Sequence, residues 1–342
     1  MEGGYKLKPR GMTAGWKPEK YGPVLGGALG NCTDCHVIRE NGIYRMWFTW
    51  QPVRCIAYTE SQDGACWEMP RIVLTPRFDS DWEIHEVSQP AVVHKDGIYH
   101  MWYTGRVYPT EITAPRCCIG YAVSRDGTHW DRHEAPVLVP ATDWENIAVM
   151  YPHVIWEGEC FRMWYSAGRI TEPSVIGAAA SRDGIHWERI KDQPVFIPNK
   201  EKYWESARVL SGFVCREENG SYTMFYVGED GDGVPGIGIA RSRDGVTDWQ
   251  RNPANPVIAG TDGFWDWRGA GKMSVHRTED GYRLWYKGIG SRFEEIGIAY
   301  HQGFDLGFDY AGDDERGVDD GTWENNLYVR DKLLMGIYAV QD

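Results

Sequence analysis

The sequence predicts an all-β fold: a five-bladed β-propeller with four antiparallel strands in each blade. A short motif that starts with Ser and ends with Trp occurs four times, and alternating apolar and aromatic strands occur five times. No segment shows helical periodicity beyond one or two turns. A repeat spacing of about sixty residues indicates a repeat architecture. Short strands of period two, four to a repeat, form one antiparallel sheet each, and five such sheets arranged radially form a propeller.

The Ser-to-Trp motif is the clearest repeated unit. Its copies are Ser61–Trp67, Ser124–Trp130, Ser181–Trp187 and Ser242–Trp249, the last with one extra residue. In each copy Asp-Gly supplies the positive φ of a tight hairpin turn, and the Ser side chain can hydrogen-bond into that turn. The Trp begins the next strand and is expected to be a buried anchor.

The remaining strands of each repeat follow a fixed order. An apolar strand comes first, then a turn with Gly, an aromatic strand, and a third strand that leads into the motif. The aromatic strands are Tyr44–Phe48, Tyr99–Tyr103, Phe161–Tyr165, Tyr222–Tyr226 and Tyr282–Tyr286. We therefore expect one propeller domain over 1–342, with blades at about 32–70, 84–135, 146–192, 205–252 and 268–305 plus 11–25. Residues 306–342 are expected to form a C-terminal extension packed on the propeller.

The N-terminus supplies the strand that the fifth repeat lacks. That repeat reaches His301 without a following Asp-Gly turn and Trp. The segment from Trp16 to Leu25 has the same spacing as the segment from Trp187 to Phe196. We predict that the strand near Trp16 is the outer strand of blade five, which would remove the open edge of the ring.

Composition narrows the classes of partner. The net charge of −13 argues against nucleic acid and anionic membrane surfaces. The chain has 17 Trp and 19 Tyr. Most of them are expected between blades, but some should line a groove where sugar rings stack. The expected partner is a small carbohydrate substrate.

The cysteines and the N-terminus favour a cytoplasmic protein. The eight Cys are scattered through strands, which favours reduced thiols. The first residues lack the apolar region of a signal peptide, and no run of eighteen apolar residues occurs. Cys32–His36 matches the c-type haem attachment pattern, but it runs into a strand and is interpreted as coincidence. No second Cys-x-x-Cys pair supports zinc, so no cofactor or metal is expected.

Taken together, the repeats resemble a known superfamily. The recurring patterns are Pro-Val-Leu, Trp-Glu, Met-Trp-Tyr-Thr-Gly and Ile-Gly-Tyr-Ala-x-Ser-x-Asp-Gly-x-x-Trp. They resemble the five-bladed propeller glycosidases, which include the arabinanase/xylosidase, invertase/levanase and mannoside phosphorylase families. The resemblance covers roughly residues 16 to 305. It implies an active site in an axial funnel, where carboxylates from successive inner strands surround a subsite for one terminal sugar.

Comparison of the repeats separates scaffold from site. Asp34 stands directly before the first apolar strand, where the resemblance implies a catalytic base or nucleophile. Its equivalents in the other repeats are Gln89, Tyr151, Ser211 and Lys272, so the scaffold does not require an acid there. The alternative is a carboxylate that only stabilises the start of the strand.

The second carboxylate departs from the pattern of these families. Gln89 and Tyr151 stand where the resemblance implies acids, and both are candidate substrate ligands. Glu86 is the better proton-donor candidate because its equivalents are not acids. Glu145 is the weaker one, because its Trp-acid pair recurs at Trp82, Trp204 and Trp265. His153 is either a sugar ligand or proton donor, or a strand histidine like His36 at the same repeat position.

The expected activity is hydrolysis of a terminal sugar from a small oligosaccharide or glycoside. Such cleavage needs one protonated and one ionised carboxyl group. Arg208, Arg268 and Lys272 precede or begin the inner strands of blades four and five and could bind sugar or hold a carboxylate ionised. If they converge on phosphate, the enzyme is a phosphorylase. The other alternative is a binding or catalytically repurposed propeller, which a pocket with only one carboxylate would favour.

Overall fold

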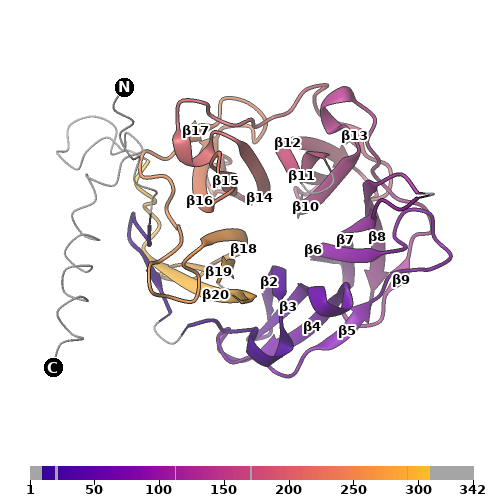
Figure 1. The fold of residues 1–342 in the computed structure, drawn as a ribbon, viewed down its shortest axis with the longest axis horizontal. Coiled ribbons are helices and arrows are strands. Elements are labelled where there is room, and N and C mark those ends of the chain that lie inside the picture. Colours follow the sequence, from indigo (N-terminus) through magenta and orange to yellow (C-terminus); the bar gives the residue numbers. More distant parts are fainter. Residues whose placement is uncertain (1–9, 20–21, 112, 170–171, 291, 309–342) are drawn as a thin grey trace.

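The computed structural model describes residues 10–19, 22–111, 113–169, 172–290 and 292–308. Over these ranges the protein is all-β, and its strands form five four-stranded antiparallel sheets around a common centre (Figure 1). The second and third sheets are joined by one parallel bridge between Ala148 and Cys117.

In the first four sheets the strands run outward from the centre in chain order. The first sheet holds β2 (Cys32–Glu40), β3 (Ile43–Trp50), β4 (Cys55–Ser61) and β5 (Arg71–Leu74). The second holds β6 (Glu86–Lys95), β7 (Ile98–Val107), β8 (Arg116–Ser124) and β9 (Asp131–Arg132). The third holds β10 (Ala148–Trp156), β11 (Phe161–Arg169), β12 (Glu172–Ser181) and β13 (Glu188–Arg189).

The fourth and fifth sheets complete the set. The fourth holds β14 (Arg208–Arg216), β15 (Tyr222–Glu229), β16 (Pro235–Ser242) and β17 (Gln250–Arg251). The fifth holds β18 (Gly269–Arg277), β19 (Gly281–Ile289), β20 (Glu294–Gln302) and β1 (Trp16–Pro18). Four 3-10 turns, η1 (Gly27–Leu29), η2 (Gln51–Val53), η3 (Asp143–Glu145) and η4 (Tyr203–Glu205), are the helical segments of the described residues. None of these turns has the length or apolar character of a membrane-spanning helix.

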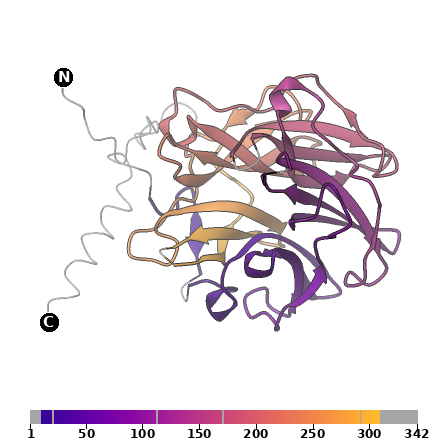
Figure 2. The same cartoon turned by 45° about the vertical axis from the view of Figure 1, so that its right-hand side comes forward.

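The N-terminal strand lies where the sequence placed it. β1 pairs antiparallel with β20, with Trp16 opposite His301 and Pro18 opposite Ala299. Both views show this indigo segment beside the last strands of the chain (Figures 1 and 2). The prediction that the strand near Trp16 is the outer strand of the fifth sheet is therefore confirmed.

The C-terminal extension is described only at its beginning. Leu306 and Phe308 are buried against the fourth and fifth sheets. The predicted packing of the rest of 306–342 lies outside the described residues.

The Ser-to-Trp motif forms the turn that was predicted and also links neighbouring sheets. In each copy the Ser hydroxyl accepts a hydrogen bond from the Gly amide, as Ser181 does from Gly184 at 2.9 Å. The Gly carbonyl in turn accepts the indole N–H of a buried Trp from the adjacent sheet, as Gly184 does from Trp102 at 2.9 Å. The same link occurs from Trp47 to Gly127, Trp164 to Gly245 and Trp285 to Gly64.

This link corrects one expectation about the anchors. The motif Trp residues, such as Trp187, are only half-buried. The fully buried anchors are the Trp residues of the middle strands. The motif Gly is required because its φ is positive and because a Cβ at Gly184 would lie 2.9 Å from the Trp102 ring.

Candidate active site

Each inner strand carries a β-bulge near its start, at the centre of the ring. The register shifts lie at the equivalent place in β2, β6, β10, β14 and β18. The bulged residues Asp34, Gln89, Tyr151 and Ser211 have φ between 53° and 57°. Non-glycine residues adopt this left-handed conformation rarely, and bulges of this kind re-aim side chains beside active sites. Lys272 holds the equivalent position in β18.

A pocket opens beside these bulges, and we call it the axial pocket. Its volume is 290 Å³, and it is lined from β10, β14, β15, β16, β18, β19, β20 and the β15–β16 loop. Its polar lining side chains are Tyr151, Arg208, Ser211, Glu229, Lys272, Lys287 and Glu294. More than one carboxylate therefore faces this pocket.

The charged groups of the axial pocket are paired. Arg208 Nε lies 3.0 Å from Glu229 Oε2, and Lys287 Nζ lies 3.6 Å from Glu294 Oε1. Burial raises the pKa of Glu229, although Arg208 and Lys287 act in the opposite direction. Burial lowers the pKa of Lys287, but the negative groups around it, Glu294 first, leave it above its ordinary value.

Asp34 is buried next to this set, although it is not itself one of the residues that line the axial pocket. Its side chain is 4% exposed, and Thr33 Oγ1 donates to its Oδ2 at 3.2 Å. Its Oδ1 has no hydrogen-bond partner among the described residues. Burial lowers the pKa of Lys272 to about 8, and the negative charge of Asp34 opposes this shift. Because Asp34 also influences Tyr151 and Lys287, its carboxylate lies within electrostatic range of three groups that line the axial pocket.

The rings of His36, His153 and Phe213, which come from three inner strands, lie close together. The His153 ring lies 4.0 Å from the Phe213 ring and 6.2 Å from the His36 ring, centroid to centroid. His153 Nε2 donates to the Val214 carbonyl at 2.9 Å, so it links the third and fourth sheets. Burial lowers the pKa of His153 to about 3, which keeps the ring neutral. These contacts are those of a strand histidine, and His153 lies outside the pocket lining.

Gln89 and Glu86 belong to the second sheet. The Gln89 side-chain oxygen accepts from Thr104 Oγ1 at 2.7 Å and from the Tyr151 amide at 3.2 Å, so it holds the neighbouring bulge in place. Glu86 pairs with Arg106, with 3.2 Å between Oε1 and Nε, and accepts a hydrogen bond from the Tyr108 hydroxyl. Neither residue lines the axial pocket.

Glu145 is held inside the third sheet. It is 0% exposed and accepts from the Tyr165 hydroxyl at 2.7 Å, from Arg189 at 2.7 and 2.8 Å, and from two backbone amides. Burial raises its pKa, but the Arg189 and backbone hydrogen bonds leave it below its ordinary value. The other Trp-acid pairs bond the equivalent tyrosine in the same way: Glu83 with Tyr103, Glu205 with Tyr226 and Asp266 with Tyr286. Glu145 is therefore part of the repeated scaffold and lies outside the axial pocket.

The three cations predicted from the sequence do not all meet. Arg208 and Lys272 line the axial pocket, whereas Arg268 is exposed, with its guanidinium 5.9 Å from the centre of the Trp267 ring. The third cation that lines the pocket is Lys287, and not Arg268 as the sequence predicted.

Sequence reasoning missed Lys287, Glu229 and Glu294, although a signal for the first two was present. Lys287 lies on the middle strand, opposite the inner-strand residue that precedes the bulge. In the other sheets the equivalent residues are uncharged: Thr49, Thr104, Ser166 and Val227. In the fourth sheet Arg208 of the inner strand faces Glu229 of the middle strand. At the same place in the second sheet, Glu86 of the inner strand faces Arg106 of the middle strand, so the ion pair recurs with the acid and the base exchanged. Comparing the middle strands as well as the inner ones would have singled out both residues.

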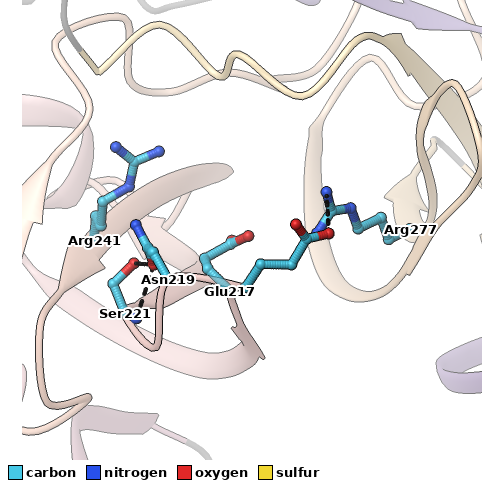
Figure 3. A pocket seen from close by; sticks show the side chains of 6 residues that line it. Glu217, Asn219, Ser221, Arg241 and Arg277 are labelled. Carbon is cyan, nitrogen blue, oxygen red and sulfur yellow. Dashed lines mark hydrogen bonds and ion pairs between the residues drawn. The ribbon is translucent and has the colours of Figure 1, made fainter.

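A second hollow of 220 Å³ lies elsewhere on the molecule (Figure 3). It surrounds the turn after β14, at the opposite end of that strand from Arg208. Glu217, Arg241 and Arg277 line it, and Arg277 Nη2 pairs with Glu218 at 3.1 Å. It contains none of the candidate residues. Within the described ranges no group of three or more His, Cys, Asp and Glu is placed to hold a metal ion.

Comparison with known proteins supports the fold. No family model matches the chain. An uncharacterized protein of Mycobacterium tuberculosis is 29% identical over 240 residues, which are 64% of this chain and 75% of that protein. A 1,2-beta-oligomannan phosphorylase of Thermoanaerobacter sp. is 26% identical over 220 residues, 63% of this chain and 68% of that enzyme. The crystal structure of a thermostable family-43 glycoside hydrolase superposes with a TM-score of 0.64 at 17% identity, covering 80% of this chain and 90% of that one.

The sheets and the superposed structure share the propeller fold, and the relative with a named activity is a carbohydrate-active enzyme. The chain is similar in sequence to enzymes of the five-bladed propeller glycosidase superfamily and shares their fold, as the repeats indicated.

Proposed function

We propose that this protein hydrolyses the glycosidic bond of a terminal sugar in the axial pocket, with Asp34 as base or nucleophile and Glu229 as proton donor. The observation that carries the proposal is the unequal environment of the two carboxyl groups. Burial raises the pKa of Glu229 although Arg208 and Lys287 act against this shift, and the ammonium group of Lys272 lies within electrostatic range of Asp34. Glycoside cleavage requires one protonated and one ionised carboxyl group, and the burial of Glu229 favours its protonated form.

The size and lining of the pocket support a small substrate. A volume of 290 Å³ is at the lower end of the range for small-molecule sites. The Ser211 hydroxyl lines the pocket and has no hydrogen-bond partner among the described residues, so it is free to bind a sugar hydroxyl. A pocket with only one carboxylate would favour a binding propeller. Because Glu229 and Glu294 both line the axial pocket, this observation does not favour that alternative.

The roles of the two acids can be separated by the leaving group of the substrate. Glu229→Gln should lower the rate on an oligosaccharide about 10²–10⁴-fold, because the sugar leaving group needs a proton. It should change the rate on the matching 2,4-dinitrophenyl glycoside little, because that leaving group departs unprotonated. Asp34→Asn should lower both rates.

Glu86→Gln is the matched control, since Glu86 belongs to the equivalent ion pair of the second sheet. Equal loss on both substrates in Glu229→Gln would contradict the proton-donor role. Unchanged turnover in Asp34→Asn would remove Asp34 from the mechanism.

Phosphorolysis is the second candidate, and a specific observation favours it. Arg208, Lys272 and Lys287 line one pocket, and Arg and Lys side chains are the usual ligands of phosphate. The sequence similarity to a 1,2-beta-oligomannan phosphorylase points the same way. We rank hydrolysis first because Arg208 and Lys287 already face Glu229 and Glu294, which leaves little surplus positive charge for a dianion.

Phosphate dependence decides between the two reactions. If hydrolysis is correct, cleavage of β-1,2-mannobiose or another cleaved disaccharide should release free sugar only, at a rate indifferent to added phosphate. If phosphorolysis is correct, sugar phosphate should form, and Arg208→Ala or Lys287→Ala should abolish the phosphate dependence. Arg268→Ala is the control, because Arg268 lies outside the pocket lining and should leave that dependence intact.

A further inference from the structure

Trp267 differs from the other tryptophans that the structure describes. Its side chain is 42% exposed, whereas the remaining described tryptophans are buried or half-buried. The neighbouring Phe264 is 56% exposed. A large exposed aromatic surface is a common feature of ligand-binding sites.

The position of Trp267 is not part of the scaffold. The repeated scaffold tryptophan of this loop is Trp265, whose ring lies 5.6 Å from that of Tyr286. Two residues after each scaffold tryptophan, the other loops have Ile84, Asn146 and Ser206. An aromatic side chain therefore occurs at this position in the fifth sheet alone.

The loop that carries Trp267 borders the axial pocket. The Arg268 amide donates to the carbonyl of Ile289 at 2.9 Å, and Ile289 lines the pocket. A Cβ at Gly269 would lie 2.7 Å from the carbonyl oxygen of Pro235, another lining residue. Trp267 therefore directly precedes Arg268 and Gly269, and both of these residues contact residues that line the pocket.

The loop is also fixed in place. Arg10 donates to the Trp267 carbonyl, and Arg10 Nε lies 3.4 Å from Asp262. Asp266 Oδ2 accepts from the Tyr286 hydroxyl at 2.9 Å. The exposed indole is therefore presented by an ordered loop, which lowers the entropy lost when a ligand stacks on it.

We infer that Trp267 is a stacking platform for a second sugar unit, next to the terminal sugar in the axial pocket. The inference rests on the proposed function and extends it, because it makes the substrate an oligosaccharide rather than a glycoside of a small alcohol. The C–H face of a sugar ring is apolar and buries well against the flat face of an indole. Sugar units beyond the terminal one should gain affinity from this contact.

Binding can test the platform separately from turnover. The Asp34→Asn variant, with and without Trp267→Ala, is titrated calorimetrically with trisaccharides that include β-1,2-mannotriose and α-1,5-arabinotriose, and with the corresponding monosaccharides. We expect Trp267→Ala to weaken the trisaccharide that binds about tenfold and to leave its monosaccharide unchanged. Phe78→Ala is the control, because Phe78 is 87% exposed in the loop that follows β5.

Equal trisaccharide affinity with and without Trp267 would overturn the inference, as would equal weakening of trisaccharide and monosaccharide or no binding by any trisaccharide. Trp267-dependent binding by a protein that cleaves nothing would support the platform while rejecting the proposed function. A loss of affinity in Phe78→Ala equal to that in Trp267→Ala would also contradict the inference.

Discussion

At the scale of single residues, Glu145 and Glu229 show how one residue type serves two purposes. Both are acids paired with Arg, but Glu145 is fully buried and Glu229 half-buried, and Glu145 also accepts hydrogen bonds from a tyrosine hydroxyl and two backbone amides. Glu229 lines a pocket, and burial dominates its environment. A carboxylate whose oxygens are all occupied by the scaffold cannot readily exchange protons with a ligand.

Glu145→Gln is therefore expected to affect stability. Removing one partner of a buried ion pair leaves Arg189 without its charge, so the free energy of unfolding should fall by on the order of 3 kcal/mol. Denaturant unfolding monitored by tryptophan fluorescence measures this. Glu229→Gln is the comparison: its ion pair with Arg208 is partly exposed, so the loss of stability should be smaller, while the rate on an oligosaccharide falls. A stable Glu145→Gln variant without activity would return Glu145 to the catalytic candidates.

At the scale of elements, the turn motif and the middle strands depend on each other. Each motif Gly receives an indole from the neighbouring sheet. The fifth repeat lacks the motif, and the fourth sheet, which would face it, has Phe225 in place of Trp. Phe225 packs edge-to-face on Trp16 of β1, with ring centroids 6.0 Å apart. The replacement fits, since an indole N–H there would have no motif carbonyl to receive it.

The acids of these turns predict a pH dependence of stability. Backbone amides of Cys66 and Ala65 lower the pKa of Asp63 to about 2. A carboxyl group whose pKa is lower in the folded state stabilises the fold above its ordinary pKa of about 3.9, and that stabilisation is lost as the pH falls toward 2. Asp63→Asn keeps the acceptor oxygen but removes the charge, so it should be less stable than wild type at pH 7.

The stability difference between wild type and Asp63→Asn should shrink between pH 4 and pH 2. Thermal melts of both proteins across this range measure it, with Glu68→Gln, an exposed acid of the same repeat, as control. A difference that stays constant with pH would show that the Asp63 charge does not contribute.

At the scale of the whole molecule, the first and last strands of the described residues pair in the fifth sheet. β1 covers the outer edge of β20, and the Trp285 indole bonds to Gly64 of the first sheet. Both contacts join residues more than two hundred positions apart in the sequence. An uncovered β20 would present unpaired backbone groups to other molecules.

Deletion of residues 1–25 tests this arrangement. Loss of β1 should expose β20 and the Phe225 ring, so the protein should aggregate or unfold at a lower temperature. Size-exclusion chromatography and thermal melts measure both effects, and a chain that begins at Arg10 and keeps β1 is the matched control. Unchanged solubility and melting temperature after the longer deletion would refute a stabilising role for β1.

The sequence by itself determined the architecture, because period-two strands and Asp-Gly turns are local signals that five repeats multiply. Even the position of the Trp16 strand followed from spacing alone. It also singled out Asp34, since a residue that differs among equivalent positions is not required by the scaffold. For the same reason it already ranked Glu145 behind Glu86.

The tertiary structure alone decided which side chains share a pocket. Tyr151, Arg208 and Lys287 are far apart in the chain and come together because the inner strands converge on one centre and β19 lies beside one of them. The sequence chose Arg268 as the third cation of the set, but Arg268 precedes its strand and points into solvent. Lys287 reaches the pocket from a middle strand instead. Which side chains share a pocket depends on the positions of the sheets relative to one another, and no local pattern of residues determines those positions.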